Sequence, residues 1–236
     1  GGMDSFHEIG MRPTLDAMAD YLATFIQLKY RRKKATIVAM SLGFVITTRM
    51  LQRHPEIAGI VEVLISMVGF MRSDDFKLTP LAGNIYKTMG IIFRRKPAAR
   101  LFRAVCLNPL VIRTLYTKTP NAKKKLEHLS KEDRARSVDF EVHLWRCNDV
   151  STYMEMIVEM ARLDNCFGSI PLDVYHVSVP NDQYFDNRVI EQHMRVVFTN
   201  FHGFIARLPN HVPSVVATKE EAAPFIPKGL RKVLST

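Results

Sequence analysis

The sequence is poor in cysteine and contains no long apolar run. Its three cysteines, Cys106, Cys147 and Cys166, form no C-x-x-C pair and no His/Cys spacing typical of zinc. This pattern argues against a disulfide framework and favours a reducing compartment. The longest apolar stretch, Ile57 to Met71, is interrupted by Glu62. It is shorter than the roughly 20 residues that a membrane-spanning helix needs.

Signals of secretion and of common nucleic-acid-binding folds are also lacking. The first 30 residues contain four acidic residues and no apolar segment typical of a signal peptide. We therefore expect a cytoplasmic protein that is at most peripheral to a membrane. No helix-turn-helix, zinc-finger, RNP or KH signature is present, which makes nucleic acid an unlikely partner. We expect no cofactor and no bound metal.

The positive charge of the chain is confined to one segment. The whole chain has 33 Lys and Arg against 23 Asp and Glu, a formal net charge of +10. Residues 71–150 hold 17 of the basic and 8 of the acidic side chains, so this segment carries +9 and the remainder +1. Such a segment attracts anionic partners, such as a lipid surface, an acidic substrate or nucleic acid. A solvated surface without a partner is the alternative.

Apolar periodicity indicates alternating helices and strands at the two ends of the chain. Leu15 to Ile26 has the i, i+3, i+4, i+7 spacing of an amphipathic helix over Thr14–Leu28. Short apolar runs at Ala35–Met40, Ile60–Met67, Pro171–Val179 and Phe201–Leu208 are typical of strands. The first run has the composition of a strand that is buried on both faces. This alternation predicts an α/β fold with a mostly parallel sheet flanked by helices.

The segment between the second and third strands has a helical pattern instead. Several of its helices begin at proline, which favours the first helical position. We expect helices over residues 80–93, 97–106, 109–116, 131–146 and 151–163. The predicted organisation is therefore a core of residues 1–70 and 151–236 with a basic helical cap of residues 71–150.

One serine separates the first strand from the helix that follows, in Ala39-Met40-Ser41-Leu42-Gly43. A sharp turn there lifts the serine hydroxyl above the sheet edge and points the Leu42 N–H at the same place. The small residues Ala39 and Gly43 would let strand and helix approach closely. A helix N-cap is the alternative interpretation of Ser41, since serine is a favoured cap.

This pentapeptide resembles the nucleophile elbow of the α/β-hydrolase superfamily, G-x-S-x-G, with Ala39 in place of the first glycine. The segments on both sides of the pentapeptide also resemble elements of this family. Gly1 to Asp4 resembles the loop after its fourth strand, Thr14 to Leu28 the helix before the elbow, and Arg53 to Glu56 the end of the helix after it. The resemblance implies that Ser41 is a nucleophile.

The family's chain order is serine, acid, histidine, and several acids fit it. Asp182, in the loop after the third strand, resembles the family's acid. The loop is about two residues longer than is usual for the family, so Asp186 competes with it. Asp74 and Asp75 follow the preceding strand, which is an alternative acid position in the family.

The predicted base lies near the end of the chain. Pro209-Asn210-His211-Val212-Pro213 resembles the family's G-H-x-P loop, with Asn210 in place of glycine. His202 is the competing histidine, whereas His176, inside a strand, is expected to be a packed core residue. The resemblance further implies that the Leu42 N–H is one oxyanion donor.

These residues imply a serine hydrolase of carboxylic esters, with a lipid-like substrate as one option. The alternative is a non-catalytic, α/β-hydrolase-like binding protein, because Ala39 and Asn210 depart from the family pattern. The family's second oxyanion donor and first strands have no counterpart here. We therefore expect a fragment or a reduced variant, weak or inactive alone, with an exposed sheet edge open to pairing. The basic cap could meet an anionic membrane surface.

Overall fold

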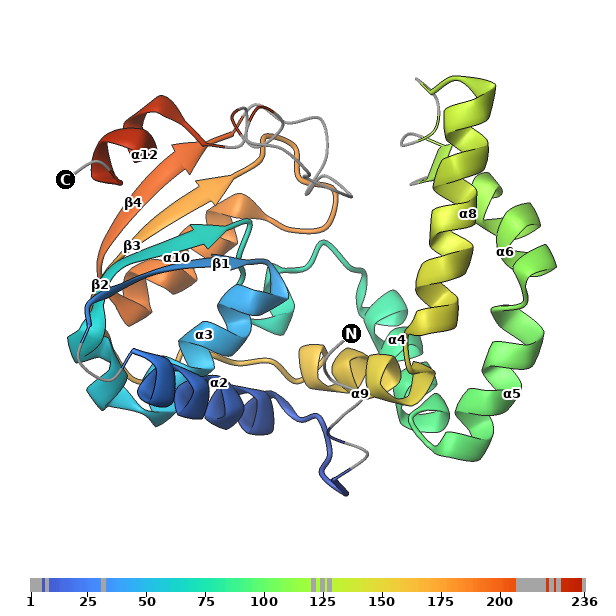
Figure 1. Cartoon of the computed structure of the whole chain (residues 1–236), viewed down its shortest axis with the longest axis horizontal. Coiled ribbons are helices and arrows are strands. Elements are labelled where there is room, and N and C mark those ends of the chain that lie inside the picture. Colours follow the sequence, from blue (N-terminus) through green and yellow to red (C-terminus); the bar gives the residue numbers. More distant parts are fainter. Residues whose placement is uncertain are drawn as a thin grey trace. The chain divides into compact units, whose positions relative to one another are not determined.

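The computed structural model describes residues 6, 9–30, 33–119, 122–123, 126, 129–206, 220, 223 and 226–234. The chain divides into two compact units, residues 15–82 with 160–236, and residues 1–14 with 83–159. The first contains a sheet flanked by helices, and the second is helical (Figure 1). The domain boundaries proposed from the sequence, after residues 70 and 150, stay a prediction.

The sheet has four strands in the described part of the chain, in the order β1-β2-β3-β4. The strands are β1 (Ala35–Met40), β2 (Val61–Met67), β3 (Ile170–Ser178) and β4 (Phe198–Ile205). Every neighbouring pair is parallel. The predicted α/β fold with a parallel sheet is therefore confirmed. Because all four strands run the same way, their carboxyl ends meet at one edge.

Helices cover both faces of this sheet (Figure 1). They are α2 (Leu15–Lys29), α3 (Leu42–Arg53), α10 (Asn187–Val197) and α12 (Lys228–Val233), with 3-10 segments η1 (Pro55–Ile60) and η2 (Ser73–Asp75). One core joins α2, α3 and α10 to Leu64 and Val174. A smaller core joins Leu230 of α12 to Ile65 and Val177. Leu64 and Ile65 are adjacent and so point to opposite faces.

The interpretation of β1 as a strand buried on both faces is wrong. Ala39 is 5% exposed, but Val38 is 60% and Met40 46% exposed. Among the described strands, β1 lies at the edge of the sheet and pairs with β2 alone. On the face of Val38, the described helix α12 packs against β2 and β3 rather than β1. Alternate residues of β1, namely Thr36, Val38 and Met40, are therefore exposed, and two of these three are apolar.

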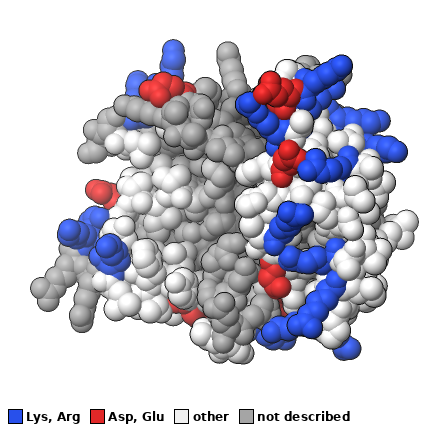
Figure 2. Space-filling model, turned by 45° about the vertical axis from the view of Figure 1, so that its right-hand side comes forward, with Lys and Arg blue, Asp and Glu red and all other residues white. Residues whose placement is uncertain are grey.

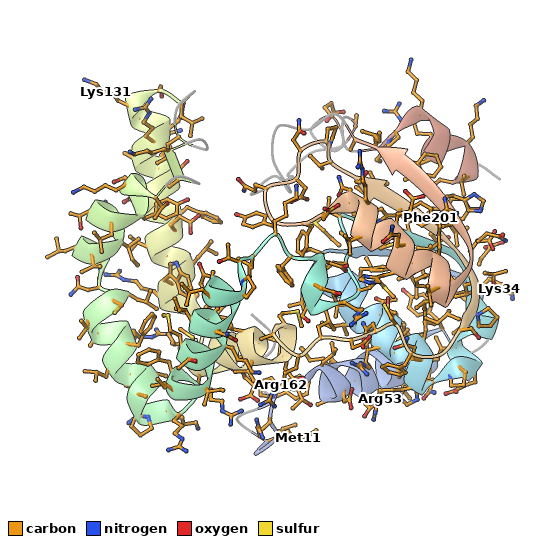
Figure 3. All side chains as sticks on the ribbon, turned by 180° about the vertical axis from the view of Figure 1, so that it is seen from behind. Met11, Lys34, Arg53, Lys131, Arg162 and Phe201 are labelled. Carbon is orange, nitrogen blue, oxygen red and sulfur yellow. The ribbon has the colours of Figure 1, made fainter. Side chains whose placement is uncertain are left out.

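A charged clamp fixes α2 to α3, the helix that follows Ser41. The Arg53 guanidinium donates to both carboxylate oxygens of Asp20, at 2.8 and 2.7 Å, and His54 Nε2 lies 2.8 Å from the same carboxylate. Figure 3 shows Arg53 beside α2. The hydrogen bond from Arg53 lowers the pKa of Asp20 to about 2. The clamp therefore ties the end of α3 to α2.

The helical unit follows the sequence prediction closely. Its elements are α4 (Pro80–Phe93), α5 (Lys96–Cys106), α6 (Pro109–Leu115), η3 (Tyr116–Lys118), α8 (Lys131–Cys147) and α9 (Val150–Met160). Asn108 and Ser130 cap α6 and α8 by accepting hydrogen bonds from Leu110 N–H and Asp133 N–H. Among the described helices, none combines the length and apolar composition that crossing a bilayer requires.

The tight packing between sheet and α3 occurs at Gly69, not at Gly43 as the sequence suggested. A Cβ added at Gly69 would lie 2.4 Å from Phe44 Cδ1 and 2.4 Å from Ser66 Oγ. A Cβ at Gly43 meets no described atom within 4 Å. Gly69 therefore lets the chain leave β2 directly against the first turn of α3.

We predict opposite effects for the two glycines. Gly69→Ala forces a methyl group into Phe44 and should lower the free energy of unfolding by about 1–3 kcal/mol. Gly43→Ala, in the first turn of α3, should raise it by about 0.4–1 kcal/mol. Urea unfolding of both variants measures this. Equal effects of the two substitutions would contradict the packing described.

His176 is a core residue, as predicted. It is 3% exposed, and its Nδ1 lies 2.9 Å from Ser66 Oγ of β2. Burial lowers its pKa from 6.5 to about 4. The folded state therefore disfavours the protonated ring, so the stability that this residue contributes is present above pH 6.5 and is lost as the pH falls toward 4.

We predict that His176 makes the fold acid-sensitive between these two pH values. The free energy of unfolding should fall by on the order of 3 kcal/mol more in the wild type than in His176→Gln when urea unfolding is measured at pH 7 and pH 4. His143→Gln, which removes an exposed histidine of α8, is the matched control and should keep the wild-type dependence. Identical pH dependence in wild type and His176→Gln would refute the assignment.

Candidate active site

Ser41 is the one residue between β1 and α3, and its backbone is strained. Its φ of 48° and ψ of −116° form a combination that residues with a Cβ rarely adopt. The Ser41 N–H donates to the Met67 carbonyl of β2 (2.9 Å), and the Ser41 carbonyl accepts from Phe44 N–H (3.0 Å). The turn is therefore held by the sheet on one side and by the first turn of the helix on the other.

The side chain of Ser41 does not cap α3. A capping serine has an extended backbone, and its hydroxyl accepts a hydrogen bond from an N–H of the first helical turn. Ser41 has a positive φ and makes no such bond. Ser130 of α8 does cap, with φ −59° and its Oγ 3.1 Å from Asp133 N. The geometry therefore corresponds to a strand–turn–helix elbow and excludes the cap interpretation.

Leu42 begins α3 directly after this turn. As the first helical residue, it has a backbone N–H with no acceptor inside the helix. The helix macrodipole adds partial positive charge at this end. The Leu42 N–H is thus able to stabilise a negative oxygen formed near Ser41, which is the role predicted for it.

Backbone strain is concentrated at the carboxyl edge of the sheet. Three non-glycine residues of the described chain have positive φ, namely Ser41 (48°), Val68 (47°) and Asn181 (56°). They follow β1, β2 and β3, at most three residues beyond the end of each strand. Strained residues tend to gather at functional sites, and ligands bind at the carboxyl ends of parallel strands. No pattern in the sequence marks Val68, since β-branched residues strongly disfavour this conformation.

Asp182 lies next to one of these strained positions and is fixed in orientation. Its side chain is buried, and its Oδ1 accepts from Tyr184 N–H at 2.8 Å and Phe185 N–H at 3.3 Å. Its carbonyl accepts from Lys77 Nζ at 2.8 Å. These contacts hold the carboxylate in the turn that follows β3.

The loop that carries Asp182 is braced by the segment after β2. Phe70, Phe76 and Phe185 form a cluster with ring centroids 4.5 to 5.1 Å apart. Phe76 and Phe185 also form an antiparallel bridge, and Lys77 N–H donates to the Tyr184 carbonyl at 2.8 Å. The two loops at the carboxyl edge therefore pack as one layer. This cluster was not predicted from the sequence.

The other acid candidates have structural roles. Asp186 caps α10, because its Oδ1 accepts from Arg188 N–H at 2.9 Å. Asp75 is fully buried, and its Oδ2 accepts from Met71 N–H (2.6 Å) and from Arg72 N–H. Its other oxygen lies 2.6 Å from His193 Nδ1.

Asp74 is exposed and pairs with the Arg72 guanidinium at 3.4 Å. With Asp75 and His193 it forms a group of ligand atoms within 4.8 Å of one another, the residue types of a metal site. The buried carboxylate of Asp75 is satisfied by its three hydrogen bonds, of which the one to His193 fastens α10 to the loop after β2.

The histidine predicted as base, His211, lies outside the described residues, as does the Gly1 to Asp4 loop. The competing His202 lies within β4, where its Nε2 is 3.2 Å from Asp173 Oδ2 and its ring stacks on Tyr175. The other described histidines also have partners: His54 with Asp20, His143 with Cys147, His176 with Ser66 and His193 with Asp75.

We predict that relief of the backbone strain at Ser41 increases the free energy of unfolding. Glycine adopts this backbone conformation readily, so Ser41→Gly should raise the free energy of unfolding by about 1 kcal/mol, while Ser41→Ala keeps the strain and should not. Urea unfolding of both variants checks this. A capping serine would behave differently, with Ser41→Ala losing about 1 kcal/mol and Ser41→Gly a few tenths.

Comparison with known proteins connects this geometry to a fold. No protein-family model and no curated protein matches the chain. An esterase from Exiguobacterium antarcticum is 13% identical with a TM-score of 0.62, over 94% of this chain and 74% of its own. A thermophilic esterase from Thermogutta terrifontis is 13% identical with a TM-score of 0.57, over 94% and 72%.

A third structure is MGS-M2, an α/β hydrolase from a Medee basin deep-sea metagenome library. It is 12% identical with a TM-score of 0.58, over 93% of this chain and 72% of its own. At such identities the similarity establishes the fold alone. Together with the parallel strands and the elbow at Ser41, it shows that the chain has an α/β-hydrolase fold.

Proposed function

We propose that the protein is a serine hydrolase that cleaves carboxylic esters, with Ser41 as nucleophile, Asp182 as acid and His211 as base. The strained, non-capping elbow at Ser41 carries this proposal. A strained turn lowers the stability of the fold, and this loss is explained if the turn exposes the serine hydroxyl to a substrate. Two of the structures with this fold are named esterases, which supports the reaction class.

Asp182 suits the role of acid better than its competitors. Its Oδ1 is held by two backbone N–H groups, which fixes the direction in which Oδ2 points. In the proposed triad, Oδ2 accepts from the imidazole Nδ1–H and fixes the tautomer of the base. Asp186 and Asp75, in contrast, serve a helix cap and a buried histidine contact.

His211 is proposed from chain order, because the family places its base after the last of these strands. The partners of the described histidines support this choice. His202, the main competitor, is held by Asp173 and Tyr175 within β4, rather than beyond its carboxyl end.

The reaction would proceed in two steps. His211 accepts the proton of Ser41 Oγ while Oγ attacks the ester carbonyl carbon, and the Leu42 N–H donates to the resulting oxyanion. The ester C–O bond then breaks, and the alcohol leaves with the proton from His211. In the second step, water gives a proton to His211 and attacks the acyl carbon on Ser41. The bond from that carbon to Ser41 Oγ then breaks, His211 returns the proton to Oγ, and the carboxylic acid is released.

We predict that a fluorophosphonate probe modifies the full chain at Ser41. Intact-mass measurement should show one label, peptide mapping should place it on Ser41, and Ser41→Ala should abolish it. Asp182→Asn should slow labelling by at least about 10²-fold, because the base loses its orientation. Hydrolysis of p-nitrophenyl esters should fall in parallel.

Ser130→Ala and Asp186→Asn are the matched controls. Ser130 is a capping serine of α8, so its replacement should cost helix stability and leave labelling unchanged. Asp186→Asn removes a carboxylate from the same loop as Asp182. Absence of any label, or labelling that survives Ser41→Ala, would refute the proposed nucleophile. Labelling that is equally slow in both aspartate variants would refute Asp182 as the acid.

A further inference from the structure

The helical unit contains a basic cavity of its own. The cavity has a volume of about 450 Å³, within the size range of small-molecule sites. It lies between α5 and the turn that joins α8 to α9, all within one unit. Its lining residues are Lys96, Ala99, Arg100, Arg103, Arg146, Cys147, Asn148, Asp149, Val150 and Ser151.

Positive charge dominates this lining. Four of the lining side chains, Lys96, Arg100, Arg103 and Arg146, are basic, and Asp149 is the one acid among them. Asp149 Oδ2 accepts from Thr152 N–H at 2.7 Å and so caps α9. Among the described residues, no carboxylate forms an ion pair with any of the four cations.

Outside the cavity, several basic side chains of the unit form ion pairs with acids. Arg94 pairs with Glu155 at 3.5 Å, and Arg113 with Asp139 at 2.6 Å. Glu132 pairs with Arg136 within α8 at 2.7 Å. These three acids are thus paired outside the cavity, while the four cations of the cavity keep their charge available to a ligand. Figure 2 shows that Lys and Arg side chains outnumber Asp and Glu on this part of the molecule.

Arg103 gives the cavity a fixed wall. Its Nη1 donates to the Arg146 carbonyl at 3.0 Å, and its Nη2 donates to the Asn148 carbonyl. These bonds fasten the α8–α9 turn to α5. Because both acceptors are neutral carbonyls, the guanidinium keeps its full charge. A cation held in place before binding loses little side-chain entropy when the ligand arrives.

We propose that this cavity binds a phosphate monoester. Three arginines and one lysine face a single acid, which suits a dianion, and guanidinium forks match the oxygens of phosphate. The volume leaves room for several atoms beyond the phosphate. The ligand is therefore a phosphorylated small molecule or the headgroup of an anionic lipid, which share this chemistry. The site uses no atom of Ser41 and stands independently of the proposed hydrolysis.

Titration of the full chain with two probes tests this proposal. Isothermal titration calorimetry with glycerol 3-phosphate presents the soluble monoester. Co-sedimentation with phosphatidylcholine vesicles, with and without phosphatidic acid, presents the lipid-bound one. The double variant Arg100→Gln/Arg146→Gln, which alters two exposed side chains, should weaken binding at least about tenfold. Ser41→Ala should leave binding unchanged.

Lys118→Gln/Lys131→Gln is the matched control, because it removes the same charge from exposed positions of the same unit. Figure 3 shows Lys131 at the outer end of α8. The control should change affinity by less than about twofold. Thermal unfolding of each variant establishes that it is folded.

Binding of glycerol 3-phosphate that only the cavity variant loses supports the proposal with a soluble ligand. Binding of phosphatidic acid vesicles alone, lost in the same way, supports it with a lipid as the source. Equal losses in the two double variants would show attraction by net charge only and would overturn the cavity. Absence of binding to both probes would overturn it as well.

Discussion

The strained turn at Ser41 is the constraint on which the rest of the sheet's carboxyl edge depends. A residue with a Cβ keeps φ 48° only when its surroundings enforce it. Here the Met67 carbonyl fixes the N–H of Ser41, and Phe44 N–H fixes its carbonyl. Phe44 packs so closely on Gly69 that no side chain fits there. The core beneath α3 therefore holds the backbone of Ser41 in this strained conformation.

Aspartates at this edge of the sheet have different hydrogen-bond partners and therefore different roles. Asp182 is held by backbone N–H groups in the turn after β3, Asp186 caps α10, and Asp75 anchors His193. Ser41 follows β1, Asp75 follows β2, and Asp182 and Asp186 follow β3, so residues far apart in sequence lie at the same edge of the sheet. The phenylalanine cluster around Phe185 joins the loops that carry these groups. The aspartates therefore differ in their hydrogen bonds rather than in residue type.

The sequence was sufficient for the elements and for the strand–turn–helix junction at Ser41, because periodicity and a strand–serine–helix order are local properties. It failed where the outcome depends on contacts between distant segments. The exposure of Val38 follows from the absence of a second described neighbour for β1, and the need for Gly69 follows from the position of Phe44. Strain at Val68 opposes the preference of valine, so no local pattern reveals it. The charge of residues 71–150 was visible, but the cavity that gathers four cations requires α5 and α8 to meet.

The most direct test of the proposed chemistry is a rapid-mixing measurement with p-nitrophenyl acetate. A serine nucleophile gives a burst of p-nitrophenol as the acyl-enzyme forms, and then a slower steady state. The expected result is a burst of one equivalent per chain, with the acetyl group found on Ser41 after an acid quench. A linear release without a burst, and no acetyl group on Ser41, would contradict nucleophilic catalysis at the elbow.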